Sequence, residues 1–308
     1  MPLSKNHHII PEFYLKNFTN SKGSIHVFSK SLIKSWKSKP NKISIIGKYY
    51  RPESSEANPE SLELFLSKIE SKAAPAIDYL INNHEMPDGE DYFNLMVFLT
   101  LLHIRIPDFR KTASNFFEKI MKKCLAITTS DEDIFNNISS RMAKESEESI
   151  SIPYESMREF IERDEYSVLF NNDFHLGAMM ETFPKLIPFF DKRKWTVLVS
   201  EVKNSFVCSD NPVALRWSDQ NLIEGLHPGL GHKKTDVSIP ISSGIAIIGN
   251  FETYYETEVL EYLIASINTN TIREADQVYS NSDDFLWIKK DNSIGNKKEL
   301  EKTLTTRE

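Results

Sequence analysis

The sequence predicts an α+β protein in which a central helical block is flanked by small antiparallel sheet elements from the N- and C-terminal parts of the chain. Two observations predict it. Between residues 58 and 191 the apolar side chains recur at helical spacing. On either side of this block they alternate or form short β-branched runs. We therefore expect one compact domain over residues 1–290, made of a helix and meander (1–52), the helical block (58–191) and a β-rich part (194–290).

Composition and charge exclude several classes of protein. The chain has 308 residues, 40% of them hydrophobic, which is enough for a sizeable core. The net charge of −7 disfavours broad, sequence-independent binding to nucleic acid but is compatible with a local basic groove. Two cysteines exclude a disulfide scaffold and a cysteine-rich zinc site, and favour the reducing cytoplasm. Because no apolar run is long enough to span a bilayer, we expect no membrane partner.

The first fifty residues are expected to form a short helix and three strands. Pro11 suits the first turn of a helix, where its missing N–H costs nothing. Phe13, Leu15 and Phe18 give this helix apolar groups to bury. Strands are expected at residues 24–29, around Trp36 and at 43–50, where β-branched and aromatic residues gather.

The helical block is expected to begin at Asn58, as a cap, with Pro59 in the first turn. Its apolar periodicity predicts helices at residues 58–80, 90–104, 108–127, 131–148, 154–163 and 172–191. The most apolar stretch, Phe93 to Ile106, is predicted to be a buried core helix. After Lys194 the pattern predicts strands at 195–199, 205–208, 237–240, 245–248, 277–280 and 285–288, with a helix at 257–269. Residues 291–308 are polar and charged, and we expect a loose tail there.

His7 and His8 are the most prominent candidates for a functional site. At the entrance of a helix, a histidine can serve as a general base or a metal ligand, and its neighbour can contact substrate. The alternative is that one caps the helix and the other faces solvent. Tyr14 adds a polar tip to the same segment. The string His-His-Ile-Ile-Pro is also similar to the histidine strand of His-Asn-His endonucleases, but only six residues precede it and no cysteine pairs are present.

Acidic and basic candidates lie on the next two helices. Glu63 and Glu70 are two helical turns apart, so they share one side of their helix and could hold a hard cation or form an exposed rim. Arg105 ends the most apolar helix and is suited to bind phosphate or carboxylate, or to form a buried ion pair, for example with Asp210. His103, on the same helix, fits a core histidine better.

The sequence Ser209-Asp210-Asn211-Pro212 follows a predicted strand. Asp210 could project from the strand end as a base or metal ligand, with Asn211 as a substrate contact, or both could simply form the turn. Cys208 is not expected to be a nucleophile, because nothing near it indicates a lowered thiol pKa. His227 and His232 flank a glycine-containing loop that lacks a phosphate-binding signature, and His175 is a weaker candidate still.

Four segments in this order resemble the bacterial domain-of-unknown-function family 4238. They are the segment from His7 to Leu15, the helix at 62–74, the segment 206–212 and Ile239-Pro240-Ile241-Ser242. The resemblance spans roughly residues 5–282 and implies one unit with no assigned chemistry. The site arginine that such proteins place after the central helix corresponds to Arg105 here.

These residue types favour a metal-assisted phosphodiester hydrolase that acts on nucleic acid or a nucleotide. In this hypothesis His8 is the base or a metal ligand, Glu70 and Asp210 hold a divalent cation (Mg or Mn rather than Zn), and Arg105 neutralises phosphate. No nucleotide-cofactor motif is present. The rival hypothesis is a non-catalytic ligand-binding or effector protein that recognises a small anion or a protein partner.

Overall fold

The computed structural model describes residues 6–54, 60–145, 152–201, 206–218, 227–252, 255 and 261–306. The expected cap at Asn58, the helix end at 146–148, strand residue 205 and the helix start at 257–260 lie outside these ranges. Contacts within the chain divide it into two compact units. Unit 1 comprises Met1–Ile106 and Met179–Glu308, and unit 2 comprises Pro107–Ala178. The predicted single domain over residues 1–290 stays a prediction, because contacts do not test independent folding.

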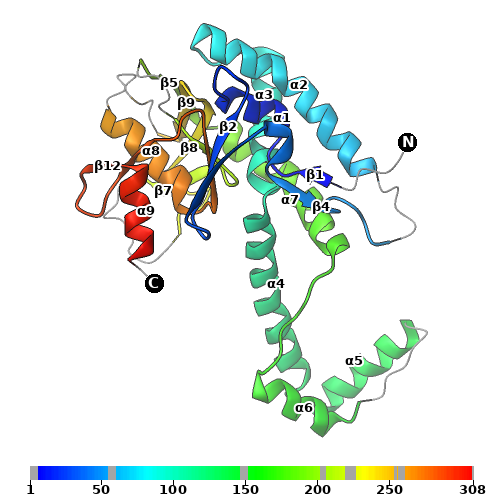
Figure 1. Cartoon of the computed structure of the whole chain (residues 1–308). Coiled ribbons are helices and arrows are strands. Elements are labelled where there is room, and N and C mark those ends of the chain that lie inside the picture. The colour runs from blue at the N-terminus through cyan, green and yellow to red at the C-terminus, as the bar shows by residue number, and fades with distance from the viewer. Residues whose placement is uncertain are drawn as a thin grey trace. The chain divides into compact units, whose positions relative to one another are not determined.

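The α+β fold is confirmed, with helices between sheet elements that come from both ends of the chain (Figure 1). The strands are β1 (Asn6–His8), β2 (Ile25–Ser29), β3 (Lys34–Ser38), β4 (Ile45–Gly47), β5 (Lys194–Val199), β6 (Cys208–Ser209), β7 (Ala214–Trp217), β8 (Thr235–Ser242), β9 (Ile245–Asn250), β10 (Gln277–Ser280), β11 (Leu286–Ile288) and β12 (Ile294–Asn296). The helices are α1 (Glu12–Leu15), α2 (Ser61–Asn83), α3 (Gly89–Ile104), α4 (Pro107–Thr128), α5 (Glu132–Glu145), α6 (Tyr154–Arg163), α7 (Asn172–Asp191), α8 (Glu261–Arg273) and α9 (Lys297–Thr305). Short 3₁₀ turns follow α1 (Lys16–Phe18) and β3 (Pro40–Lys42).

One sheet joins the two ends of the chain. Its strand order is β3-β2-β10-β6, so strands before residue 40 pair with strands after residue 207, all antiparallel. A second four-stranded sheet, β5-β9-β8-β7, comes entirely from the C-terminal part, and β8 and β9 are buried along their whole length. Two strand pairs, β1-β4 and β11-β12, complete the set among the described residues. The β1-β4 pair sets His8 opposite Ile45.

The N-terminal segment is anchored in unit 1 rather than frayed. Tyr14, Leu15 and Phe18 are fully buried, as the apolar spacing of this helix predicts. The hydroxyl of Tyr14 donates to the carbonyl oxygen of Pro240 in β8, and its ring packs against Phe98 of α3. The first residues of the chain therefore fold back onto a strand more than two hundred residues away.

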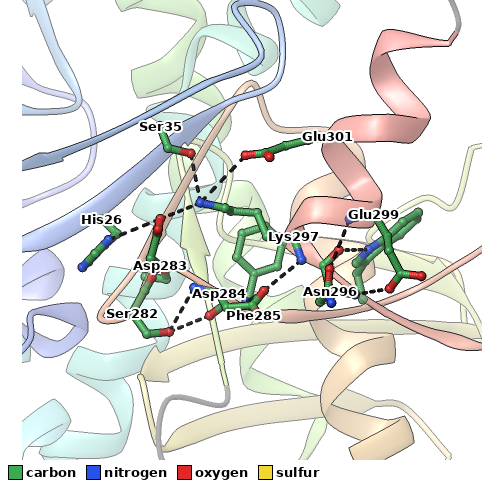
Figure 2. Close-up of polar contacts among 12 residues, drawn as sticks. His26, Ser35, Ser282, Asp283, Asp284, Phe285, Asn296, Lys297, Glu299 and Glu301 are labelled. Atoms are coloured by element: carbon green, nitrogen blue, oxygen red, sulfur yellow. Dashed lines mark hydrogen bonds and ion pairs between the residues drawn. The ribbon is translucent and has the colours of Figure 1, made fainter.

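The expected loose tail is wrong. Residues 294–305 form β12 and α9, and the side chains of Asn296 and Glu299 make a capping box at the start of the helix. Leu300 is buried in a cluster with Phe28, Val207, Ile272, Val278, Phe285 and Trp287. Lys297 is 7% exposed, and its ammonium lies 2.5 Å from Asp283 and 3.1 Å from the hydroxyl of Ser35 (Figure 2). The capping residues and one buried leucine order a segment whose average composition is polar.

No helix among the described residues is both long enough and apolar enough to cross a membrane.

Candidate functional site

A cavity of about 380 Å³ opens beside the N-terminal segment of unit 1. It is lined by Asn6, His7, His8, Pro11, Glu12, Phe13, Lys16, Tyr50, Glu63, Leu66, Ser67, Glu70 and Arg105. These residues come from β1, α1, α2, the end of α3 and the segment after β4. The cavity thus brings together five of the residues singled out from the sequence.

Arg105 is the centre of this arrangement. It is the residue after α3, the most apolar helix, and it is only 2% exposed. Its Nη1 donates to Oε1 of Glu70 at 2.7 Å, its Nε to the hydroxyl of Tyr50 at 3.1 Å, and its Nη2 to the carbonyl oxygen of His8 at 2.8 Å. Burial alone would lower the pKa of this guanidinium, but Tyr50 and Glu70 raise it, so Arg105 stays charged.

His7 is held by the backbone. Its Nδ1 accepts a hydrogen bond from the amide of Tyr50 at 2.9 Å, and its ring packs against the Tyr50 ring, with 5.4 Å between the centroids. Because Nδ1 is the acceptor, a neutral His7 carries its proton on Nε2, which lies 3.7 Å from Oε2 of Glu63. The side chain is 3% exposed, so this contact fixes the ring at the cavity wall.

His8 is half-buried in the same wall. Burial lowers its pKa, and the nearby Arg105 guanidinium lowers it further, whereas Glu12, Glu70 and the carbonyl of Ile43 oppose the shift. The imidazole is therefore neutral at pH 7. Its Nδ1 is buried and makes no hydrogen bond within the described parts of the chain. A neutral imidazole at a cavity wall is able to take a proton from a bound molecule.

Carboxylates outnumber cations around the cavity. Glu12, Glu63 and Glu70 line it, against Lys16 and Arg105. Lys16 lies 3.0 Å from Glu12, and Arg105 is bound to Glu70, which leaves the cavity with one excess negative charge when both histidines are neutral. Glu70 and Glu63 are 25% and 43% exposed, so both are accessible from solvent.

Asp210 and Asn211 are not among the residues that line this cavity. The two carboxylate oxygens of Asp210 accept the backbone N–H groups of Asp276 and Gln277, each at 3.1 Å. Burial raises its pKa to about 6, and these N–H groups act in the opposite direction. The amide of Asn211 donates to the hydroxyl of Ser209, as in a turn. The predicted pairing of Arg105 with Asp210 is wrong, since the carboxylate on Arg105 is Glu70.

The remaining candidates have other surroundings. Tyr14 is fully buried and does not line the cavity. Burial lowers the pKa of His103 to about 4, and Arg193 acts in the same direction. Burial raises the pKa of the Cys208 thiol, which agrees with an unreactive cysteine. His232 lies with its ring edge on Trp217, 5.0 Å between centroids, and His227 is exposed. Burial and Arg110 lower the pKa of His175.

A family model described as "Protein of unknown function (DUF4238)" matches residues 6–284 of the chain. The chain belongs to this family. The matched region contains every residue that lines the cavity, and it ends before β11, β12 and α9. Searches of the curated proteins and of the solved structures found no match. Membership in DUF4238 therefore delimits the conserved unit and assigns no reaction to it.

Three residues of the cavity were missed in the sequence. Tyr50 follows Tyr49 in a run that resembles a strand, and nothing local indicates that its hydroxyl accepts from Arg105. Glu12 and Lys16 do carry a local signal, because they are four residues apart in a predicted helix and form an ion pair there. Among the described residues, no group of three or more His, Cys, Asp or Glu side chains is arranged to hold a metal ion.

Proposed function

We propose that this DUF4238 protein is a metal-assisted phosphodiester hydrolase whose site is the His8 cavity, with a nucleotide or nucleic acid as its substrate. The observation that carries the proposal is the neutral imidazole of His8 in the wall of a cavity with excess carboxylate. His8 would act as the general base that takes a proton from the attacking water.

The charge balance supports a cation as the second component. A phosphodiester carries one negative charge, and the cavity carries another, so substrate and site together require about two positive charges. A divalent cation would supply them and would stabilise the charge on the leaving oxygen. Mg²⁺ is commonly held by one or two carboxylates together with water and substrate oxygens, so a site with three protein ligands is not required. Glu70 and Glu63 are the accessible carboxylates for this role.

Arg105 has a different role in this proposal from the one that its sequence position predicts. Its three nitrogens donate to Glu70, Tyr50 and the His8 carbonyl, which directs them toward the protein. Arg105 is then a positioning residue: it fixes the backbone that carries the base. Asp210 is left out of the metal site, because its oxygens already accept two backbone N–H groups.

The second candidate function is non-catalytic recognition of a small ligand or a protein partner in the same cavity. The burial of Arg105 favours it, since a catalytic arginine that neutralises phosphate usually presents free donors to the substrate. Here the imidazole of His8 would recognise the ligand without any proton transfer.

Hydrolysis assays on single-stranded DNA, RNA and a chromogenic phosphodiester, with Mg²⁺, Mn²⁺ or Zn²⁺ and with chelator, separate the two functions. We expect metal-dependent turnover that falls by about 100-fold or more in His8→Ala. His227→Ala is the matched control, because this histidine is exposed and outside the cavity. Absence of turnover on all three substrates with every metal, or equal activity of His8→Ala and His227→Ala, contradicts the hydrolase.

A further inference from the structure

Unit 2 buries few of its apolar side chains. Within its described residues the buried large hydrophobics are Phe135, Ile161 and Leu176. The exposed ones are Phe116, Phe117, Ile120, Met121, Ile127, Ile134, Met142, Ile152, Phe160 and Leu169. Soluble proteins leave single apolar residues exposed without consequence, but a gathering of this kind on one short helical unit indicates a surface that is covered in the working assembly.

The largest part of this surface is one face of α4. Phe109, Ala113, Phe116, Ile120 and Ile127 follow one another at intervals of four, three, four and seven residues. These are the a and d positions of a heptad repeat, with Lys123 at the d position between Ile120 and Ile127. Phe116 and Ile127 are 59% and 66% exposed. We call these six residues the α4 stripe.

The opposite face of α4 is used inside unit 2. Lys122 lies 2.6 Å from Asp164, and the carboxylate of Glu118 accepts the amide of Val168. Figure 1 shows the chain after α6 returning alongside α4. Successive residues of an α-helix are rotated by about 100°, so Glu118 and Lys122 lie about 160° around the axis from Phe116 and Ile120. The packing that orders unit 2 therefore leaves the α4 stripe uncovered by its own elements.

The α4 stripe is complementary to itself when it is reversed. In an antiparallel pair of identical helices, residues at equal distances on either side of the midpoint face each other, and a positions face d positions. With the midpoint at residue 118, Phe116 faces Ile120 and Phe109 faces Ile127. Ala113 then faces Lys123, and its small side chain gives room for the lysine stem. Every position of the stripe has a partner in this register.

We propose that two copies of this chain associate through α4, packed antiparallel along the α4 stripe. The pair would have a two-fold axis near residue 118, which is a closed and isologous arrangement. The α4 stripe spans fewer than three heptads, so we expect a dimer whose population depends on protein concentration.

Charge distinguishes this dimer from other occupants of the stripe. Lys119 lies beside the proposed axis and would face Lys119 of the second copy, which weakens the pair by repulsion. Salt screens that repulsion, so the dimer is expected to strengthen as ionic strength rises. An anionic partner, such as nucleic acid, an acidic protein or a lipid surface, would be attracted to Lys119 and Lys123, and its binding would weaken with salt.

Cross-linking of single-cysteine variants tests the register. Cys124 is exposed and Cys208 is buried, so Cys124→Ser removes the accessible native thiol. In that background we expect a short bis-maleimide to join two copies of Lys119→Cys. Lys111→Cys is the matched control: it is exposed on the same helix, but the two copies of residue 111 would be about 21 Å apart along the axis.

Sedimentation across a concentration and salt series gives the independent measurement. We expect a monomer–dimer equilibrium that shifts toward dimer at high salt, and a monomer at every concentration for Phe116→Ser. This exposed substitution should leave helix content by circular dichroism unchanged. A wild-type protein that is monomeric throughout overturns the proposal. So does a dimer that Phe116→Ser leaves intact, or cross-linking that is equal at residues 119 and 111.

Discussion

The guanidinium of Arg105 donates a hydrogen bond to the carbonyl oxygen of His8, with 2.8 Å between the two atoms. The two residues are ninety-seven positions apart in the chain. The same guanidinium binds Glu70 of α2 and Tyr50, which follows β4. One buried cation therefore fixes the end of the core helix, the N-terminal strand pair and the helix that carries the acidic wall of the cavity.

Replacement of Arg105 by methionine should destabilise the protein by about 3 kcal/mol. The change leaves the His8 carbonyl and the Tyr50 hydroxyl without their donor and leaves Glu70 without its counter-ion. Arg105→Lys should recover only part of this loss, because one ammonium does not reach three acceptors in the geometry of a guanidinium. Urea denaturation measures the free energy of unfolding. Arg158→Met is the control, since the Arg158–Glu162 pair is exposed and should contribute little. Equal effects at the two positions would show that Arg105 does not anchor the site.

His103 should make stability depend on pH. Its pKa is lowered to about 4 by burial and by Arg193, against about 6.5 in the unfolded chain. The unfolded state therefore binds the proton first, and stability is full above pH 6.5 and is lost as the pH falls toward 4. The two pKa values correspond to about 3 kcal/mol by pH 4.

His103→Leu tests this dependence, because leucine cannot titrate and removes a ring whose Nδ1 is buried without a hydrogen bond. The variant should be similar in stability to the wild type at pH 7 and more stable than it at pH 4.5, by urea denaturation at both values. His8 and His175 also have lowered pKa values and remain in both proteins, so the difference between the two curves isolates His103. Parallel curves for the two proteins would exclude this role.

Local sequence patterns were sufficient for the parts of the structure that depend on local physics. The apolar run from Phe93 to Ile106 predicts the core helix α3, and the residues around Pro11 predict the anchored α1. The capping box at Asn296 and Glu299 was also readable, but the polar average of the last eighteen residues concealed it. Composition describes a mean, whereas a helix start depends on two side chains three residues apart.

Long-range partners could not be predicted in the same way. The sequence places Arg105 at the end of a buried helix and indicates a buried ion pair, yet Glu70 and Asp210 are equally plausible partners from one chain. The choice depends on how α2 packs against α3 and on the strand pairing that occupies Asp210 with Asp276 and Gln277. Both are tertiary facts, with no trace in local periodicity.

Asp210 is the residue whose substitution separates a structural role from a metal-binding one. If its carboxylate serves only to join β6 to β10, Asp210→Ala should cost about 3 kcal/mol, because two backbone N–H groups lose their acceptor. Asp210→Asn keeps one acceptor oxygen and should cost less, while any metal-induced thermal shift and hydrolysis stay at the wild-type level.

The pH dependence of the Asp210 contribution gives a second, independent readout of the same variant. Burial raises the pKa of this carboxyl to about 6, above the unfolded value near 3.8, so the folded state retains the proton longer. Its contribution to stability is therefore full below pH 3.8 and is lost as the pH rises through 6, opposite in sign to that of His103. Asp210→Asn should lack this loss. A variant that keeps wild-type stability but no longer responds to Mg²⁺ or Mn²⁺ would instead assign Asp210 to the metal site, and the two backbone N–H groups would then be secondary to its function.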